Sequence, residues 1–212
     1  MIELPTYITK LPVLNKKIEI NPLTVKQEKN IGAAKQTGGN ESAFVTFLKI
    51  LDTLVNVDIK KLSEPDLIHC IIELRKFSIG EKFKTSFVCP HSKQKITKEV
   101  DCSAIKISGK KHKSLVNEMG YTVEIIIPKN QKNAWSAVSY IETAKEKIDF
   151  SELTPIKKEN IFNGLPVKVK NKIEKELTSL LHYEYKLNYA SDRNHTIVVR
   201  SAEDFFILLF VM

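Results

Sequence analysis

Cysteine and histidine are the residue types in this chain whose spacing suggests chemistry. Cys89 and His91 lie two residues apart in a predicted turn, and the other two cysteines are Cys70 and Cys102. A structural zinc ion needs four Cys or His ligands, which commonly come as two close pairs. Ser92 stands where a second cysteine would complete a Cys-x-x-Cys pair with Cys89. We therefore expect a turn without a metal ion.

Nucleophilic catalysis by Cys89 is a second chemistry to weigh. A cysteine nucleophile needs a histidine base and an electropositive, partly exposed setting. His91 satisfies only adjacency along the chain, and Cys70 lies among apolar residues, which is typical of a small core residue. The seven glycines fit neither the dinucleotide-binding nor the P-loop spacing, and the carboxylates are not grouped. The sequence therefore predicts no catalytic residue, no cofactor and no enzymatic activity.

The basic residues are numerous but spread along the chain. Thirty-three Lys and Arg against 25 Asp and Glu give a net charge of +8, and residues 1–101 and 102–212 each carry +4. One stretch, from Cys102 to Asn117, contains no acid. Its lysines in a predicted loop are Lys106, Lys110, Lys111 and Lys113. Two interpretations stay open here, a solvated loop and a nucleic-acid-binding module that uses these lysines.

Membrane insertion and export are both disfavoured by the sequence. No stretch reaches the ~18 apolar residues that a membrane-spanning helix needs. The first ten residues lack the charged and apolar regions of a signal peptide. Three cysteines are an odd number, which favours free thiols over structural disulfides. We therefore expect a protein that stays in a cytosol.

Helix signals follow an extended start. Residues 1–20 read as extended segments that contain two prolines. Thr24 and Gln27 have the spacing of a capping box, and Gly38-Gly39 is a natural helix stop. Helices are predicted over residues 25–36, 41–56 and 63–80.

The apolar period changes to two beyond residue 80, which indicates strands. A β-hairpin is predicted over residues 83–102, with further strands over 105–107 and 121–127. Helical spacing returns at Trp135, Val138 and Ile141, and again behind Pro166. These patterns predict an α+β fold in which N-terminal helices pack with a β-hairpin and a small antiparallel sheet, followed by a helix-rich C-terminal part. The expected domains are residues 1–128 and 129–212.

The chain ends in eight consecutive apolar residues, from Phe205 to Met212. A strand is expected over residues 196–199, and Ser201 with Asp204 forms another capping pair before the apolar run. Burial of each large side chain contributes ~1.5 to 3 kcal/mol, so this segment must be covered. It lies either in the core of its own chain or in the groove of a partner. The candidate partner-binding residues in this segment are Phe205, Phe206, Leu208, Leu209 and Phe210.

The order of several short motifs resembles that of a known family. The motifs are Leu11-Pro12, Lys16-Lys17-Ile18, Asn21 to Lys29, Leu62 to Asp66, Leu74 to Glu81, Cys89-Pro90 and Val100-Asp101. In this order they are similar to the baseplate hub proteins of T-even-type contractile-tailed bacteriophages. The match is clearest at Leu74 to Glu81 and covers roughly residues 10–128.

This resemblance implies a non-enzymatic tail protein that assembles the baseplate hub, either as an assembly chaperone or as a hub subunit. Its partners would be other baseplate hub or tail proteins, and the chain itself is compatible with an oligomer. It would work in the host cytoplasm during assembly and, as a subunit, in the tail baseplate of the virion. Phe87 in the hairpin and Arg75, where the third helix meets the hairpin, are further candidate partner contacts. The alternative for Arg75 is an ion pair within the chain.

Overall fold

The structure is a computed structural model that describes residues 5–128, 133–191 and 193–211. The chain divides into two compact units. The first unit contains residues 1–106 and 183–212, and the second contains residues 107–182. The first unit is therefore formed by both ends of the chain. These ranges differ from the division at residue 128 that the sequence suggests.

The first unit begins with a hairpin and a long helix. Strands β1 (Tyr7–Lys10) and β2 (Lys17–Ile20) pair antiparallel. The helix α1 (Val25–Leu54) begins at the predicted capping box of Thr24 and Gln27. Gly38 and Gly39 leave the helical conformation, so α1 consists of two helical segments with a kink between them. The predicted stop at this glycine pair is confirmed, although the chain resumes the helix at once.

A second helix leads into the predicted hairpin. The short helix η1 (Ile59–Lys61) precedes α2 (Glu64–Ser78), which Ser63 caps. Strands β3 (Lys82–Val88) and β4 (Lys95–Asp101) pair antiparallel over all seven residues, so the hairpin prediction is confirmed. The short helix η2 (Cys102–Ala104) and strand β5 (Lys106–Ser108) follow. The last turn of α2 is thus joined to β3 by only three residues.

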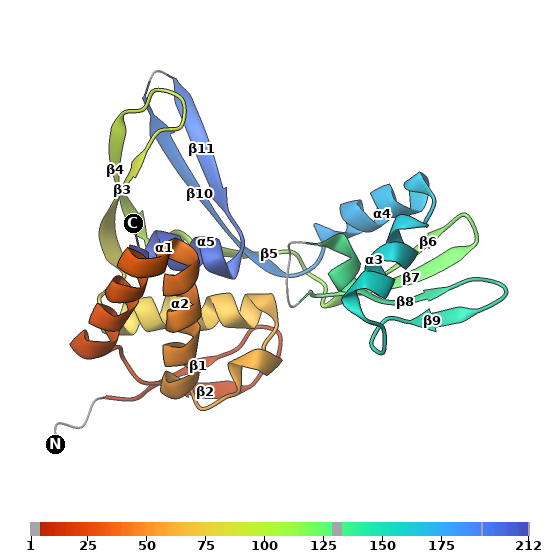
Figure 1. Ribbon diagram of the computed structural model, residues 1–212, viewed down its shortest axis with the longest axis horizontal. Coiled ribbons are helices and arrows are strands. Elements are labelled where there is room, and N and C mark those ends of the chain that lie inside the picture. Colours follow the sequence, from red (N-terminus) through yellow and green to blue (C-terminus); the bar gives the residue numbers. More distant parts are fainter. Residues whose placement is uncertain (1–4, 129–132, 192, 212) are drawn as a thin grey trace. The chain divides into compact units, whose positions relative to one another are not determined.

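The C-terminal segment completes the first unit. Strands β10 (His182–Ala190) and β11 (Asn194–Val199) form a second hairpin, which lies beside the β3–β4 hairpin in Figure 1. The helix α5 (Ala202–Phe206) begins at the predicted cap, Ser201, and continues as a π-helical turn, η4 (Ile207–Val211). Phe206 lies 4.7 Å from Phe47 of α1 between ring centres. The end of the chain therefore packs into a core made by the N-terminal helices.

The second unit contains a four-stranded antiparallel sheet with helices (Figure 1). Its strands, in spatial order, are β6 (Lys113–Glu118), β7 (Tyr121–Ile126), β8 (Val138–Glu142) and β9 (Lys147–Asp149). Its helices are η3 (Ala134–Ala137), α3 (Pro155–Asn163) and α4 (Val167–Leu177). The helix predicted behind Pro166 is confirmed as α4, with Val169 and Ile173 buried.

The predicted helix through Trp135, Val138 and Ile141 is wrong. Trp135 lies in the short helix η3, and Val138 and Ile141 lie on strand β8. The register between β7 and β8 shifts by one residue, since Ile125 faces Val138 while Glu124 faces Tyr140. A β-bulge of this kind places two residues three apart on the same buried face. The spacing of three therefore imitates a helix.

The expectation of a helix-rich C-terminal part is also wrong. Strands and short helices alternate there, and β9, β10 and the helix α3 were not predicted from the sequence. The alternation of buried and exposed residues along β10 is the pattern of a half-buried strand. The structure confirms the predicted α+β fold with N-terminal helices, a β-hairpin and small antiparallel sheets.

Candidate partner-binding pocket

Arg75 lies in the last turn of α2, where the chain changes from helix to strand. Its carbonyl oxygen accepts hydrogen bonds from the backbone N–H groups of Ile79 and Gly80, at 3.0 and 3.2 Å. Gly80 has a φ of +124°, a backbone conformation that residues other than glycine rarely adopt. The reversal at Gly80 brings β3 back over the helix end. As a result, the guanidinium carbon of Arg75 lies 4.5 Å from the centre of the Phe83 ring.

The Arg75 side chain is buried but unpaired. Only 5% of the residue is exposed, and the side chain forms no hydrogen bond or ion pair with the residues that the structure describes. Two of its nitrogens, Nε and Nη1, are buried without an acceptor. An unsatisfied buried donor costs about 1–3 kcal/mol, and more when it is charged. The predicted alternative of an intramolecular ion pair is therefore absent from the described part of the chain.

The charge of Arg75 persists at neutral pH. Burial lowers the pKa of the guanidinium, and charge interactions with Cys102, in its thiolate form, and with the carboxylate of Glu28 oppose that shift. An arginine nevertheless stays protonated in proteins because its ordinary pKa is above 12. The ring of Phe83 stabilises the cation, which contributes ~0.5–2 kcal/mol. The ring does not replace a hydrogen-bond acceptor, and Nε and Nη1 remain without one among the described residues.

Arg75 lines a pocket of about 330 Å³ in the first unit. The other lining residues come from α1, the segment before it, the residue after α2, β3 and η4; they are Leu23, Glu28, Ile31, Gly32, Lys35, Ile79, Phe83, Lys84, Leu209, Phe210 and Val211. Two hydrogen bonds connect the segments around this pocket. Lys35 Nζ donates to the carbonyl of Val211 at 2.8 Å, and the backbone N–H of Leu23 donates to Ser78 Oγ at 2.8 Å.

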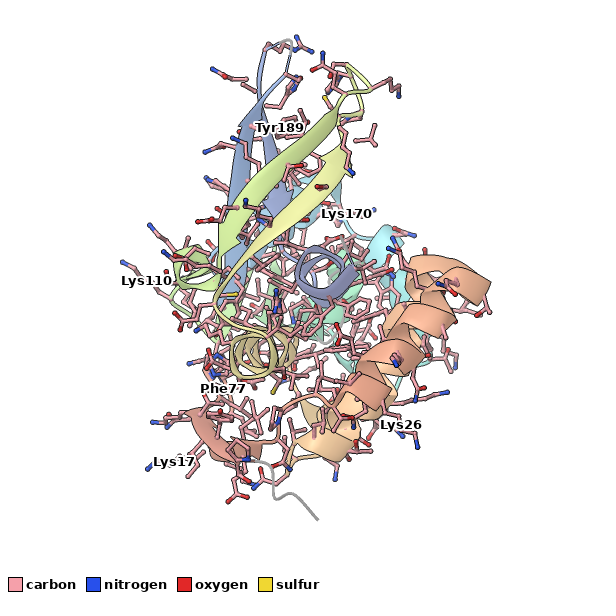
Figure 2. All side chains as sticks on the ribbon, turned by 90° about the vertical axis from the view of Figure 1, so that its left-hand side faces the viewer. Lys17, Lys26, Phe77, Lys110, Lys170 and Tyr189 are labelled. Atoms are coloured by element: carbon pink, nitrogen blue, oxygen red, sulfur yellow. The ribbon has the colours of Figure 1, made fainter. Side chains whose placement is uncertain are left out.

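Phe87 lies between the two hairpins of the first unit rather than at the pocket. Its half-buried ring meets Tyr189 of β10 edge to face, with 4.9 Å between ring centres. Figure 2 shows Tyr189 on β10 beside the β3–β4 hairpin. Sequence reasoning missed Tyr189, although the alternation of Tyr183, Tyr185, Leu187 and Tyr189 was a signal for a buried strand face.

Cys89 forms a covered thiol at the tip of the β3–β4 hairpin. Its Sγ lies 3.4 Å from Ser191 Oγ, and the hydroxyl of Tyr189 donates to it at 3.6 Å. Burial raises the pKa of this thiol, but hydrogen bonds from Ser191, Ser92 and Tyr189 outweigh it and lower the pKa to about 5. The residue has no exposed surface. No group of three or more metal-binding side chains occurs within residues 5–128, 133–191 and 193–211.

The apolar terminal residues lie in the core of the first unit. Phe205, Phe206, Leu208 and Leu209 are all at most 3% exposed, while Phe210 is half-buried and lines the pocket. Met212 lies outside the described residues. The sequence left open whether this segment packs in its own core or in the groove of a partner. The structure shows these four side chains packed within the chain. Of the predicted terminal residues, Leu209 and Phe210 both line the pocket, and Phe210 is the more exposed of the two.

The four lysines of the alternative nucleic-acid site do not form one unpaired group. Lys106 belongs to the first unit and the other three to the second. Lys111 pairs with Glu176 at 3.6 Å and Lys113 pairs with Glu124 at 3.3 Å. Lys110 extends into solvent (Figure 2). Acids from α4 and β7, distant in sequence, thus offset two of the four charges.

A comparison with protein families decides the affiliation of the chain. Residues 4–207 match the family model described as T4 bacteriophage base plate protein. The chain belongs to the T4 bacteriophage base plate protein family. No curated protein and no solved structure matches it significantly.

Membership of the T4 bacteriophage base plate protein family covers both units, because the match includes nearly all of the chain. The resemblance seen in the sequence is thus confirmed for the baseplate, and the hub role within it stays a proposal. Other tail proteins are the partners that this family implies. Among the described residues, no helix is long and apolar enough to cross a membrane.

Proposed function

We propose that this baseplate protein is non-enzymatic and acts in the assembly of the baseplate hub, as an assembly chaperone or as a hub subunit. It would work through protein–protein contacts with other hub or tail proteins, first in the host cytoplasm and, as a subunit, in the virion tail. Membership of the baseplate family supports this role. The observation that carries it is the buried and unpaired guanidinium of Arg75 in the pocket.

An unpaired buried cation is costly for a chain that functions alone. Removing one partner from a buried charge pair typically costs 3–5 kcal/mol, because the remaining charge is left without compensation. Arg75 is buried, its Nε and Nη1 have no acceptor among the described residues, and it lines a pocket. Arginine is also among the residues that contribute most to protein interfaces. A partner that supplies an acceptor would recover this energy on binding.

The proposal is tested by co-expression of the tagged chain with each baseplate hub protein of the same phage. We expect a stable complex with at least one of them after affinity purification and gel filtration. Failure to form a complex with every hub protein, alone and in combination, would contradict the proposed hub role.

The two forms of the proposal differ in the mature particle. Mass spectrometry of purified phage tails would detect the chain if it is a hub subunit. Its presence in assembly intermediates but not in purified particles would identify an assembly chaperone. Neither location, in an infection in which the chain is expressed, would contradict both forms.

A further inference from the structure

We propose that the Arg75 pocket binds the side-chain carboxylate of an acidic residue that is flanked by apolar residues on a partner protein. The inference rests on the proposed function only for the origin of the partner. Its physical basis is the combination of an unpaired buried guanidinium with apolar walls in one pocket of about 330 Å³.

The unpaired donors of the guanidinium favour an acceptor that lies in its plane. Nε and Nη1 have no acceptor among the described residues, and the ring of Phe83, 4.5 Å from the guanidinium carbon, does not supply one. A guanidinium has five N–H donors in a planar fork, which matches the two oxygens of a carboxylate. Charge-assisted pairs of this kind are about twice as strong as neutral hydrogen bonds.

The charges around the pocket favour an anionic ligand. Arg75, Lys35 and Lys84 line it together with a single acid, Glu28. Lys35 already donates to the carbonyl of Val211, so Arg75 is the lining cation with buried N–H groups that lack an acceptor. The charges therefore select an anion, and the choice between a carboxylate and a phosphate group depends on the rest of the lining.

The apolar part of the lining favours a peptide over a small hydrated anion. Leu23, Ile31, Phe83, Leu209 and Phe210 line the same pocket as Arg75. Pockets for small ligands measure ~300–1,000 Å³, so this one lies near the lower limit. It therefore suits an acidic side chain with an apolar neighbour. Burial of that neighbour supplies affinity, while Arg75 supplies specificity.

Nuclear magnetic resonance tests this inference directly because the chain contains three arginines. The Nε–H signals of Arg75, Arg193 and Arg200 are to be followed while blocked peptides are added to the full-length protein. The probes are acetyl-Phe-Asp-Phe-amide and the matched acetyl-Phe-Asn-Phe-amide. We expect a saturable shift of the Arg75 signal with the Asp peptide, at least tenfold tighter than with the Asn peptide. The Arg200 signal should not move, since its Nε already donates to Glu184 at 2.8 Å.

Two variants are used, so that the test does not fail if one of them does not fold. R75K assigns the signal and should abolish the preference for the Asp peptide. Gly32→Leu should weaken binding of the Asp peptide at least tenfold while Arg75 is retained. The reason is that Gly32 lines the pocket, and the space where a Cβ would lie is open.

Three outcomes would overturn the inference. They are equal binding of the Asp and Asn peptides, no shift of the Arg75 signal with either peptide, or tighter binding of inorganic phosphate than of the Asp peptide. Each of these could occur while the chain still forms a complex with a hub protein. Failure of the pocket inference is therefore distinguishable from failure of the proposed function.

Discussion

The guanidinium of Arg75 lies over the ring of Phe83, with 4.5 Å between the guanidinium carbon and the ring centre. The two residues come from different elements, the last turn of α2 and the strand β3. The left-handed conformation of Gly80 between these elements allows the contact. It holds a charged side chain in a buried position without giving it a hydrogen-bond acceptor. Nε and Nη1 therefore keep their hydrogen-bond donors without an acceptor among the described residues.

Replacement of Arg75 by methionine should not destabilise the isolated chain. Methionine fills similar space and removes an uncompensated buried charge, which is often neutral or stabilising. We expect the free energy of unfolding of Arg75→Met, measured by urea denaturation, to equal or exceed that of the wild type. A loss of more than ~1 kcal/mol would show that the contact with Phe83 outweighs the cost of burial.

Truncation of Phe206 should destabilise the first unit strongly. The side chain is fully buried and contacts the rings of Phe44, Phe47 and Phe210. Phe→Ala substitutions in cores cost ~3–5 kcal/mol, because they remove apolar contact and leave a cavity. Hydrogen exchange of the α1 and α2 amides measures this loss. Unchanged protection in Phe206→Ala would mean that the terminal segment is not part of the core.

Stability of the first unit should fall as the pH falls below about 6.5 because of His69. Its ring nitrogens form hydrogen bonds with Thr9 Oγ1 at 2.7 Å and the Tyr183 hydroxyl at 2.6 Å. Burial lowers the pKa of His69, and Glu73 partly opposes the shift. The unfolded chain therefore binds more protons than the folded chain between the lowered pKa and the ordinary value of about 6.5.

The His69 contribution is thus fully present above pH 6.5 and is lost toward the lowered pKa. Hydrogen exchange of α2 between pH 7.5 and 5 would show it, after correction for the intrinsic dependence of exchange on pH. We expect a smaller decrease of stability in His69→Gln than in the wild type. An equal decrease in both would assign the pH dependence to other groups.

The alternative function as a nucleic-acid-binding module predicts that the lysines bind DNA. Binding through phosphates weakens steeply with salt. The logarithm of the binding constant falls with the logarithm of the salt concentration, with a slope of about 0.9 per neutralised phosphate. Because Lys111 and Lys113 are paired with acids, we expect no binding of a 20-base-pair DNA duplex to the wild type at 50 mM salt. Binding that weakens when Lys110 and Lys106 are replaced by Gln would favour the alternative.

Local signals predicted the helical part of the first unit well. Thr24 with Gln27, Ser63 and Ser201 all cap helices as their side chains suggested. The β3–β4 hairpin was visible from a period of two. These features depend on residues that are close in sequence, so the chemistry of single side chains determines them.

Features that depend on pairing between distant segments could not be read in the same way. The bulge at Ser139, between Val138 and Tyr140, is set by the register of β8 against β7, and it produces a helix-like spacing on a strand. The first unit is closed by residues 183–212, far from its other part in sequence. No periodicity along the chain identifies this return.

The candidate site was predicted in part. The position of Arg75 at the helix-to-hairpin junction followed from the sequence, but its burial against Phe83 did not. Lys35 of α1 donates to Val211, which lies 176 residues further along the chain beside Phe210, and this meeting depends on the packing of η4 against α1. Partner contact through the other terminal residues was predicted from apolar character alone, which core and interface share.

The affinity of the chain for a hub protein that co-purifies with it tests the central claim most directly. Dissociation constants are to be measured by calorimetry for the wild type, Arg75→Lys and the exposed control Arg200→Lys. We predict at least a tenfold weaker complex for Arg75→Lys, since lysine lacks the planar fork, and an unchanged one for Arg200→Lys. Equal affinity of the wild type and Arg75→Lys would contradict the assignment of the Arg75 pocket as the partner-binding site.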